Sequence, residues 1–127
     1  MKQKIQNQQH YTRIERLRKP VASKIRRKAA DIYIDENHLK HIFNRHKAEL
    51  AKLGLTPLML VDLVVNGFNQ IYKSNTTNSI LLVKWNGIPQ VVVIELNFAL
   101  RKEFYEVKTA FIRNKEDFRT LKLLWKK

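Results

Sequence analysis

The segment HLKHIFNRHK, residues 38–47, holds three of the chain's four histidines together with an arginine. If it is helical, His38, His41 and Arg45 lie on one face of the helix. His46 lies toward the edge of that face. Histidine exchanges protons near neutral pH, and arginine can hold a phosphate group through two parallel hydrogen bonds. The segment therefore offers acid–base chemistry at a phosphate ester, although the solvated side of an ordinary helix shows the same spacing.

The same spacing argues against a metal site. Histidines three and five residues apart do not match the helical zinc motif, in which histidines four residues apart enclose a glutamate. No acidic residue lies between His38 and His46, and the neighbouring lysines and arginine would repel a metal ion. The chain has no cysteine, which excludes disulfides, thiolate zinc sites and cysteine nucleophiles. We therefore expect neither a metal nor another cofactor.

Metal-free cleavage of RNA fits this set of residues. A general base takes the proton of the ribose 2′-hydroxyl, a general acid protonates the departing 5′-oxygen, and cations stabilise the crowded phosphate. Histidine suits both proton roles, and the residues by themselves do not say which of the three histidines take them. Arg45 would hold the phosphate, and His38 is a further substrate-binding candidate on the same helix face.

Two later segments supply further candidates for the site. In LLVKWNG, Lys84 offers a point charge for phosphate, and Trp85 offers a ring on which a base can stack. A hydrophobic core or a hairpin end would use Trp85 equally well. In YEVKTAF, strand alternation places Thr109 on the same face as Tyr105 and Val107, where its hydroxyl can donate to a phosphate oxygen. The alternative for Thr109 is an ordinary strand residue without a role in the site.

Two helices should carry the first part of this site. A helix over residues 36–53 is predicted by Asp35 as N-cap and by Gly54 as the stop. Thr56, followed by proline, indicates the start of a second short helix. The apolar residues of the first helix recur at helical spacing and should form its core side: Leu39, Ile42, Phe43, Leu50 and Leu53.

The second half of the chain indicates a sheet. DIYID already alternates as a short strand, and from residue 68 four apolar runs follow: FNQIYKS, SILLVKW, QVVVIELNFA and EFYEVKTAFI. WNGIP is a hairpin signal between two of them. Asn114 should cap a closing helix, KEDFRTLKLLWKK. The expected fold is α+β, with N-terminal helices packed on one face of a four-stranded, or slightly larger, antiparallel sheet and with a C-terminal helix.

Charge and length suggest one domain with a basic arm. The net charge is +14 over 127 residues, and residues 1–30 carry 10 lysines and arginines against one acid. We expect residues 1–30 to be a partly helical arm, interrupted at Pro20, and residues 31–127 to be a single domain. Nucleic acid is the leading partner for such a charge, and an anionic membrane surface or an acidic protein are the alternatives. No apolar run is long enough to span a membrane, and no export signal is expected.

The motifs IYIDENHLKHIFNRH, ILLVKWNGIPQVVVIEL and EFYEVKTAFI, within residues 31–113, resemble the barnase/EndoU/colicin/RelE-like (BECR) ribonuclease superfamily. The similarity extends most clearly to nuclease domains of phage proteins and of contact-dependent toxins. It implies a metal-independent endoribonuclease, often directed at transfer RNA. By position, it implies catalytic roles for His41, Arg45, His46 and Thr109, with Lys84 as an additional candidate. His41 and His46 would then move the two protons, in an order that the sequence leaves open.

The function expected from the sequence is thus a small endoribonuclease of a bacterial toxin or phage-related system. RNA is the expected substrate, with transfer RNA as a candidate, and an acidic immunity protein or antitoxin is the expected protein partner. The cytoplasm would be the site of action, reached as part of a larger secreted toxin. The alternatives are a nucleic-acid-binding module without catalysis and a protein-interaction or phage structural domain.

Overall fold

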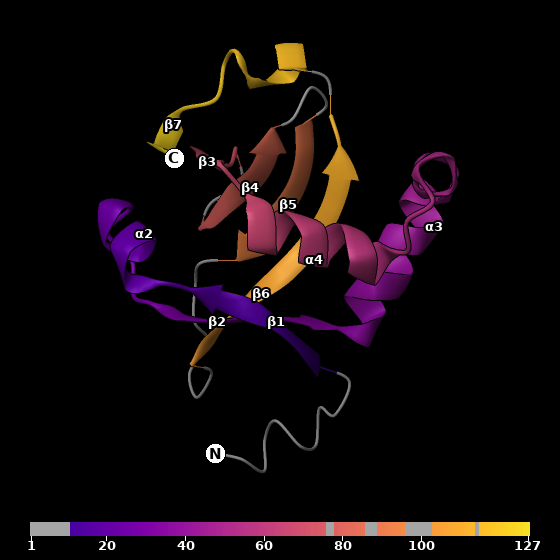
Figure 1. Cartoon of the computed structure of the whole chain (residues 1–127), viewed down its shortest axis with the longest axis horizontal. Coiled ribbons are helices and arrows are strands. Elements are labelled where there is room, and N and C mark those ends of the chain that lie inside the picture. Colours follow the sequence, from indigo (N-terminus) through magenta and orange to yellow (C-terminus); the bar gives the residue numbers. More distant parts are fainter. Residues whose placement is uncertain (1–10, 76–77, 86–88, 96–102, 114) are drawn as a thin grey trace.

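The computed structural model describes residues 11–75, 78–85, 89–95, 103–113 and 115–127. Its strands are β1 (Tyr11–Leu17), β2 (Ala30–Asp35), β3 (Gln70–Lys73), β4 (Ser79–Trp85), β5 (Pro89–Glu95), β6 (Phe104–Ile112) and β7 (Leu123–Lys126). Its helices are α2 (Lys19–Lys24), α3 (Glu36–Leu53) and α4 (Pro57–Gly67), followed late in the chain by the 3₁₀ turn η1 (Lys115–Phe118). The strands form one sheet in the order β1-β2-β6-β5-β4-β3-β7 (Figure 1).

The sheet is mixed, because β2 and β6 pair in parallel while the other neighbours pair antiparallel. The register between β2 and β6 runs only from Asp31 opposite Phe104 to Tyr33 opposite Glu106. Farther along β6, β5 still pairs on one side, and on the other α3 contacts the strand, with His46 beside Phe111. Helix α3 lies at the right of Figure 1, beside the end of β6. The sheet therefore opens between β2 and the second half of β6, and α3 occupies that opening.

The expected four-stranded antiparallel sheet with N-terminal helices is wrong. The described chain begins with β1, which pairs with β2 along its whole length, and the sheet has seven strands. Tyr, Thr and Ile are good strand formers, and pairing with β2 satisfies the backbone groups of both segments. Pro20 does not interrupt a longer helix but stands in the first turn of α2, where its missing N–H costs no hydrogen bond.

The expected C-terminal helix is also wrong. After η1 the chain forms β7, which pairs antiparallel with β3 at the edge of the sheet. Leu124 packs on the main core, and the Trp125 ring meets Phe68 edge to face at 5.5 Å. Pairing with β3 covers an open strand edge, a gain that helical spacing within the segment itself does not reveal. The predicted cap, Asn114, lies outside the described residues.

Local signals predicted the two long helices correctly. The Asp35 side chain accepts the backbone N–H of His38 at 2.7 Å, and α3 ends at Gly54 with φ of 68°. Thr56 Oγ1 accepts the N–H of Met59 at 3.1 Å at the start of α4. A capping side chain satisfies a backbone donor that the first helical turn leaves free, so these short patterns act without help from the rest of the fold.

The helix side of the sheet carries the main core, which includes Ile42 and Leu50 of α3. Of the other expected core residues of this helix, Leu39 is partly buried, whereas Phe43 and Leu53 are 49% and 41% exposed. A second, smaller core lies on the opposite side of the sheet and consists of Tyr72, Leu81, Val83, Val91 and Phe118. Because both sides of the sheet are covered, the sequence of β4 is a continuous apolar run and does not alternate with polar residues.

Two tyrosines attach the basic N-terminal segment to β6. The Tyr11 hydroxyl donates to Glu106, and the Tyr105 hydroxyl donates to the Lys28 carbonyl at 2.7 Å. Burial raises the pKa of both phenols, and the hydrogen bond to Glu106 raises that of Tyr11 further, so both stay protonated donors. Residues 1–10 lie outside the described part of the chain, and the division into an arm and a domain at residue 30 stays a prediction.

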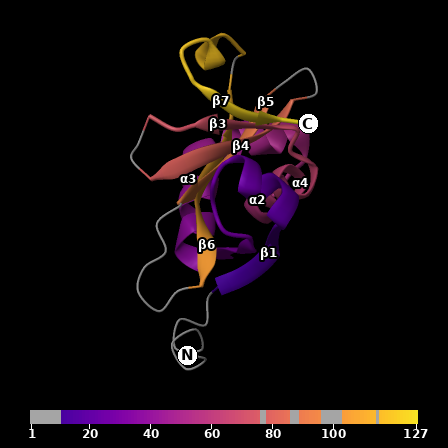
Figure 2. The same cartoon turned by 90° about the vertical axis from the view of Figure 1, so that its left-hand side faces the viewer.

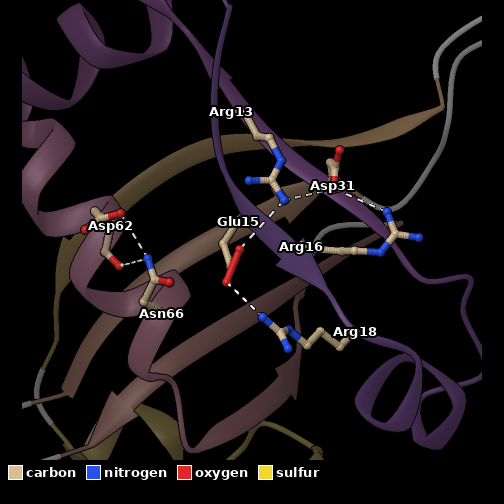
Figure 3. A network of polar contacts seen from close by, with 7 residues as sticks. All are labelled: Arg13, Glu15, Arg16, Arg18, Asp31, Asp62 and Asn66. Carbon is tan, nitrogen blue, oxygen red and sulfur yellow. Dashed lines mark hydrogen bonds and ion pairs between the residues drawn. The ribbon is translucent and has the colours of Figure 1, made fainter.

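Arg13 and Arg16 of β1, and Arg18 directly after it, form ion pairs along the β1–β2 edge (Figure 3). Arg13 and Arg16 each reach Asp31 Oδ1, at 3.3 and 3.2 Å, and Arg18 lies 3.5 Å from Glu15 Oε2. Burial alone would raise the pKa of Asp31, but the hydrogen bonds from Arg13 and Arg16 outweigh it and lower the pKa. Part of the basic N-terminal charge is therefore neutralised within the fold. None of the described helices combines the length and the apolar character needed to cross a membrane.

Candidate functional site

A cleft of about 760 Å³ opens between α3 and the second half of β6, where β2 no longer pairs with β6. Four residues selected from the sequence line this cleft: His41, Arg45, His46 and Thr109. Glu49, Phe111, Arg113 and Asp117 also line it. We call this concavity the histidine cleft. It joins residues of one helix to residues that lie about sixty positions later in the chain.

A break in α3 brings the two histidines to the same cleft. In a regular helix, residues five positions apart point about 140° away from each other, so His41 and His46 would diverge. His46 instead has φ of −129° and ψ of 19°, which interrupts the helical geometry within α3. Both histidines border the cleft, His41 as an exposed residue and His46 with a side chain that is 23% exposed.

His46 has a carboxylate partner. Its Nδ1 lies 2.8 Å from Glu49 Oε1, one helical turn further along α3. A carboxylate that accepts the proton on Nδ1 fixes the tautomer of the ring and leaves Nε2 as the basic atom. The Phe111 ring lies beside the imidazole with 6.1 Å between centroids. His46 is therefore oriented on one side by a hydrogen bond and on another by an aromatic contact.

An irregularity in β6 determines how Thr109 is placed. Thr109 pairs with Val93 and Val107 pairs with Ile94, so Lys108 is an extra residue, as in a β-bulge. After the bulge it is Ala110, and not Thr109, that follows Tyr105 and Val107 into the main core. The expectation that Thr109 shares their face is wrong. Thr109 remains half-buried and lines the histidine cleft.

The charged residues of the cleft differ in how they are paired. Arg113 lies over the Phe111 ring at 4.9 Å, and its Nε is 3.9 Å from Asp117 Oδ2. Arg45 is exposed and makes no ion pair with any residue in the described part of the chain. An unpaired guanidinium can present its paired N–H donors to an incoming phosphate without first giving up a carboxylate.

The other three sequence-selected residues lie outside the cleft. His38 is in the first turn of α3, with Nδ1 2.7 Å from the N-cap residue Asp35. Lys84 lies against Gly67, where an added Cβ would stand 3.3 Å from Lys84 Nζ. Trp85 packs on Phe118 with 5.3 Å between ring centroids, within the second core. The structure thus separates these three from His41, Arg45, His46 and Thr109.

The sequence-based selection missed five cleft residues: Glu49, Phe111, Ile112, Arg113 and Asp117. For Glu49 a signal was present, because a residue three positions after His46 on a helix lies beside it. Phe111 was assigned only to a strand, and Asp117 to the first turn of a helix that does not form. Their place in the cleft follows from the course of the chain after β6, which no short motif indicates.

Among the described residues, no three His, Asp or Glu side chains converge closely enough to hold a metal ion. Comparison with protein-family models, with curated proteins and with solved structures found no match. The similarity to the BECR superfamily therefore rests on the quoted motifs alone, and functional conclusions must come from the chemistry of the cleft.

Proposed function

We propose that this protein is a metal-independent endoribonuclease that cleaves RNA in the histidine cleft. The observation that supports it most is the meeting of His41, Arg45 and His46 in one cleft, with Glu49 Oε1 2.8 Å from His46 Nδ1. A base held by a carboxylate, a second proton-transfer group and a cation for phosphate are the groups that such a reaction needs.

The Glu49 contact suggests which histidine is the base. His46 Nε2 takes the proton of a ribose 2′-hydroxyl, and the 2′-oxygen forms a bond to the adjacent phosphorus. The bond from phosphorus to the 5′-oxygen breaks, and protonated His41 supplies the proton that this oxygen needs. The products are a 2′,3′-cyclic phosphate and a free 5′-hydroxyl. No redox step or external nucleophile takes part.

Phosphate binding falls to the cationic and hydroxyl groups of the cleft. Arg45, which is unpaired among the described residues, holds the non-bridging oxygens that gain charge in the transition state. The Thr109 hydroxyl donates to one of them. The Phe111 ring keeps the imidazole of His46 in place and supplies an apolar wall. Lys84, Trp85 and His38 are not given a role at the reacting phosphate in this proposal.

The proposal extends to partners. A net charge of +14 favours a polyanionic substrate, and RNA, including transfer RNA, has that character. The same charge suits an acidic immunity protein or antitoxin that covers the cleft. A role as the toxic domain of a bacterial competition or phage-related system, acting in the cytoplasm of a target cell, rests on the motif resemblance described above.

The test is incubation of purified protein with total bacterial RNA in EDTA, followed by separation on a denaturing gel. We expect discrete fragments from the wild-type protein and from Lys52→Ala, an exposed residue of α3 that does not line the cleft. His41→Ala and His46→Ala should leave the RNA intact. Fragments that persist in both histidine variants would overturn the site assignment.

The net charge also supports a second function, a nucleic-acid-binding module without catalysis. In that case wild-type protein would retard RNA on a native gel and leave it uncut with and without EDTA. The His46→Ala variant would then bind RNA as the wild-type protein does and would also leave the RNA uncut. The two functions therefore give different products in the same experiment.

A further inference from the structure

A second concavity, of about 490 Å³, lies on the side of the molecule that carries α2, β3 and β7. Figure 2 views the molecule from this side, with α2 in front and α3 farther back. Three cations from distant parts of the chain line it: Arg27, Lys73 and Lys122. Asn75 and Asn78 add amide groups at the turn between β3 and β4. We call it the cationic pocket.

Backbone hydrogen bonds position the residues that carry these cations. The N–H of Lys73 donates to the carbonyl of Lys122 at 2.8 Å, which places the two lysines on adjacent segments. The N–H of Arg27 donates to the carbonyl of Ala22 at 2.9 Å and fixes the chain directly after α2. The fold thus sets the backbone positions of the three residues, and their charged side-chain ends can adjust to a ligand.

The cations of this pocket lack acidic partners within the described part of the chain. No carboxylate lines the pocket, and none of Arg27, Lys73 and Lys122 forms an ion pair with a described residue. This contrasts with Arg13 and Arg16, which share Asp31. Like charges gathered without a counter-ion raise the free energy of the fold, so an external anion that enters the pocket gains from all three.

The two concavities are separated by several strands. Lys73 lies opposite Ile80, which lies opposite Ile94, which pairs with Val107, so three strand spacings separate Lys73 from β6. The histidine cleft lies farther along β6, which puts it roughly 20 Å from the pocket at ~4.8 Å per strand and ~3.3 Å per residue. That line crosses the sheet, so an RNA that contacts both places must follow the surface and needs more than the six nucleotides that span 20 Å at about 3.4 Å per stacked nucleotide.

We propose that the cationic pocket binds a backbone phosphate of the RNA whose scissile phosphate lies in the histidine cleft. This inference rests on the proposed function and adds a substrate requirement, because an RNA of about three nucleotides cannot reach both places. Backbone phosphate contacts position a nucleic acid without reading its sequence. The pocket therefore selects for length and shape.

The experiment measures binding of fluorescein-labelled 2′-O-methyl oligonucleotides of ~3 and ~20 nucleotides by fluorescence anisotropy. These probes have no free 2′-hydroxyl, so they cannot be cut by the proposed chemistry. The pocket variant carries Arg27→Gln, Lys73→Gln and Lys122→Gln. The control carries Lys40→Gln, Lys52→Gln and Lys126→Gln, which remove the same charge from exposed residues outside both concavities.

We expect the pocket variant to bind the long probe about ten- to a hundredfold more weakly than the control does. The slope of log affinity against log salt should be smaller by about 0.7, the value for one phosphate contact on a single strand. Binding of the short probe should be equal in both variants. Each single variant, such as Lys122→Gln, should lose about three- to fivefold, and thermal unfolding should confirm that all of them fold.

Equal losses of long-probe binding in the pocket variant and the control would overturn the inference. The inference would also be overturned if the pocket variant lost as much affinity for the short probe as for the long one. A poly-glutamate peptide that loses affinity in the same proportion as the long probe would contradict the RNA assignment and favour an acidic protein partner. Absence of RNA cleavage by the wild-type protein would overturn the proposed function alone, because the binding probes do not depend on catalysis.

Discussion

The histidine cleft and the cationic pocket are both polar concavities of a strongly basic chain, but their residues differ in kind. The cleft combines two histidines and two carboxylates with arginines, and one histidine is bound to a carboxylate at 2.8 Å. Among the described residues that line the pocket there are three cations and no carboxylate. Positive charge is sufficient to bind a polyanion, whereas proton transfer needs groups that can change charge near neutral pH.

Irregular backbone borders both regions. At the cationic pocket, φ is 59° at Arg26 and 60° at Asn78, beside the hydrogen bond between Lys73 and Lys122. At the histidine cleft, the backbone is non-helical at His46 and Lys108 is an extra residue in β6. Irregular backbone redirects side chains in both places, so the two regions are distinguished by the chemical types of their side chains.

The strongest test of this difference is His46→Ala. We expect the rate of RNA cleavage to fall by about 10²–10⁴-fold, because a general base is lost. Affinity for the 2′-O-methyl probes should stay within about twofold, since phosphate contacts dominate binding. The pocket variant should show the opposite pattern: weaker binding of the long probe, and an unchanged cleavage rate on a substrate too short to reach the pocket. A similar loss of rate in both would remove the distinction between the two regions.

Glu49→Gln should have the next largest effect. The amide cannot hold the imidazole tautomer as a carboxylate does, so the cleavage rate should fall by about ten- to a hundredfold, as for other partners that orient a histidine. The matched control is Glu116→Gln, which removes the same charge from an exposed position outside the cleft. Equal rates for the two variants would mean that the contact between His46 and Glu49 has no catalytic role.

Replacing arginine by lysine separates geometric recognition from charge. In the cleft, Arg45→Lys keeps the charge but loses a charged hydrogen bond worth about 1.5 kcal/mol, so kcat/KM should fall about tenfold. In the pocket, Arg27→Lys should change the affinity for the long probe by less than about twofold, because charge alone acts there. Steady-state kinetics and anisotropy on the same preparations check both values.

Asp31→Asn should give the smallest effects. It releases Arg13 and Arg16 from their shared carboxylate, so RNA affinity should rise by about two- to fivefold in anisotropy measurements. The pKa of Asp31 is lowered in the folded state, so its ionised form adds stability that is present above the ordinary carboxyl pKa and is lost as the pH falls below it.

The ionised Asp31 side chain adds at most about 1 kcal/mol to the free energy of unfolding, because its ion pairs with Arg13 and Arg16 are partly exposed. Thermal unfolding followed between pH 7 and pH 3 should show a steeper loss of Tm at acid pH for wild type than for Asp31→Asn. Parallel curves for the two proteins would show that the ion pairs of Figure 3 do not contribute to acid sensitivity.

Much of the local structure could be predicted from the sequence. The caps Asp35 and Thr56 located the two long helices, and the four apolar runs after residue 68 correspond to β3, β4, β5 and β6. Four of the seven selected site residues meet in one cleft. Lys84 and Trp85 do not, because an alternating pattern indicates two sides of a strand without indicating which helix or loop covers each side. His38 does not because its ring lies at the N-cap residue Asp35, in the first turn of α3.

The sequence by itself determined features that depend on a few neighbouring residues: the helix caps, the helical and strand spacing, and the chemical types of the side chains in HLKHIFNRHK. Only the tertiary structure decided that residues 11–17 and 123–126 become strands, that β2 and β6 pair in parallel, and that Thr109 reaches the cleft of His46. The reason is physical. Caps and spacing act through contacts between neighbouring residues. Strand pairing instead satisfies the backbone N–H and C=O groups of segments far apart in the chain, and all strand-forming segments compete for these pairings.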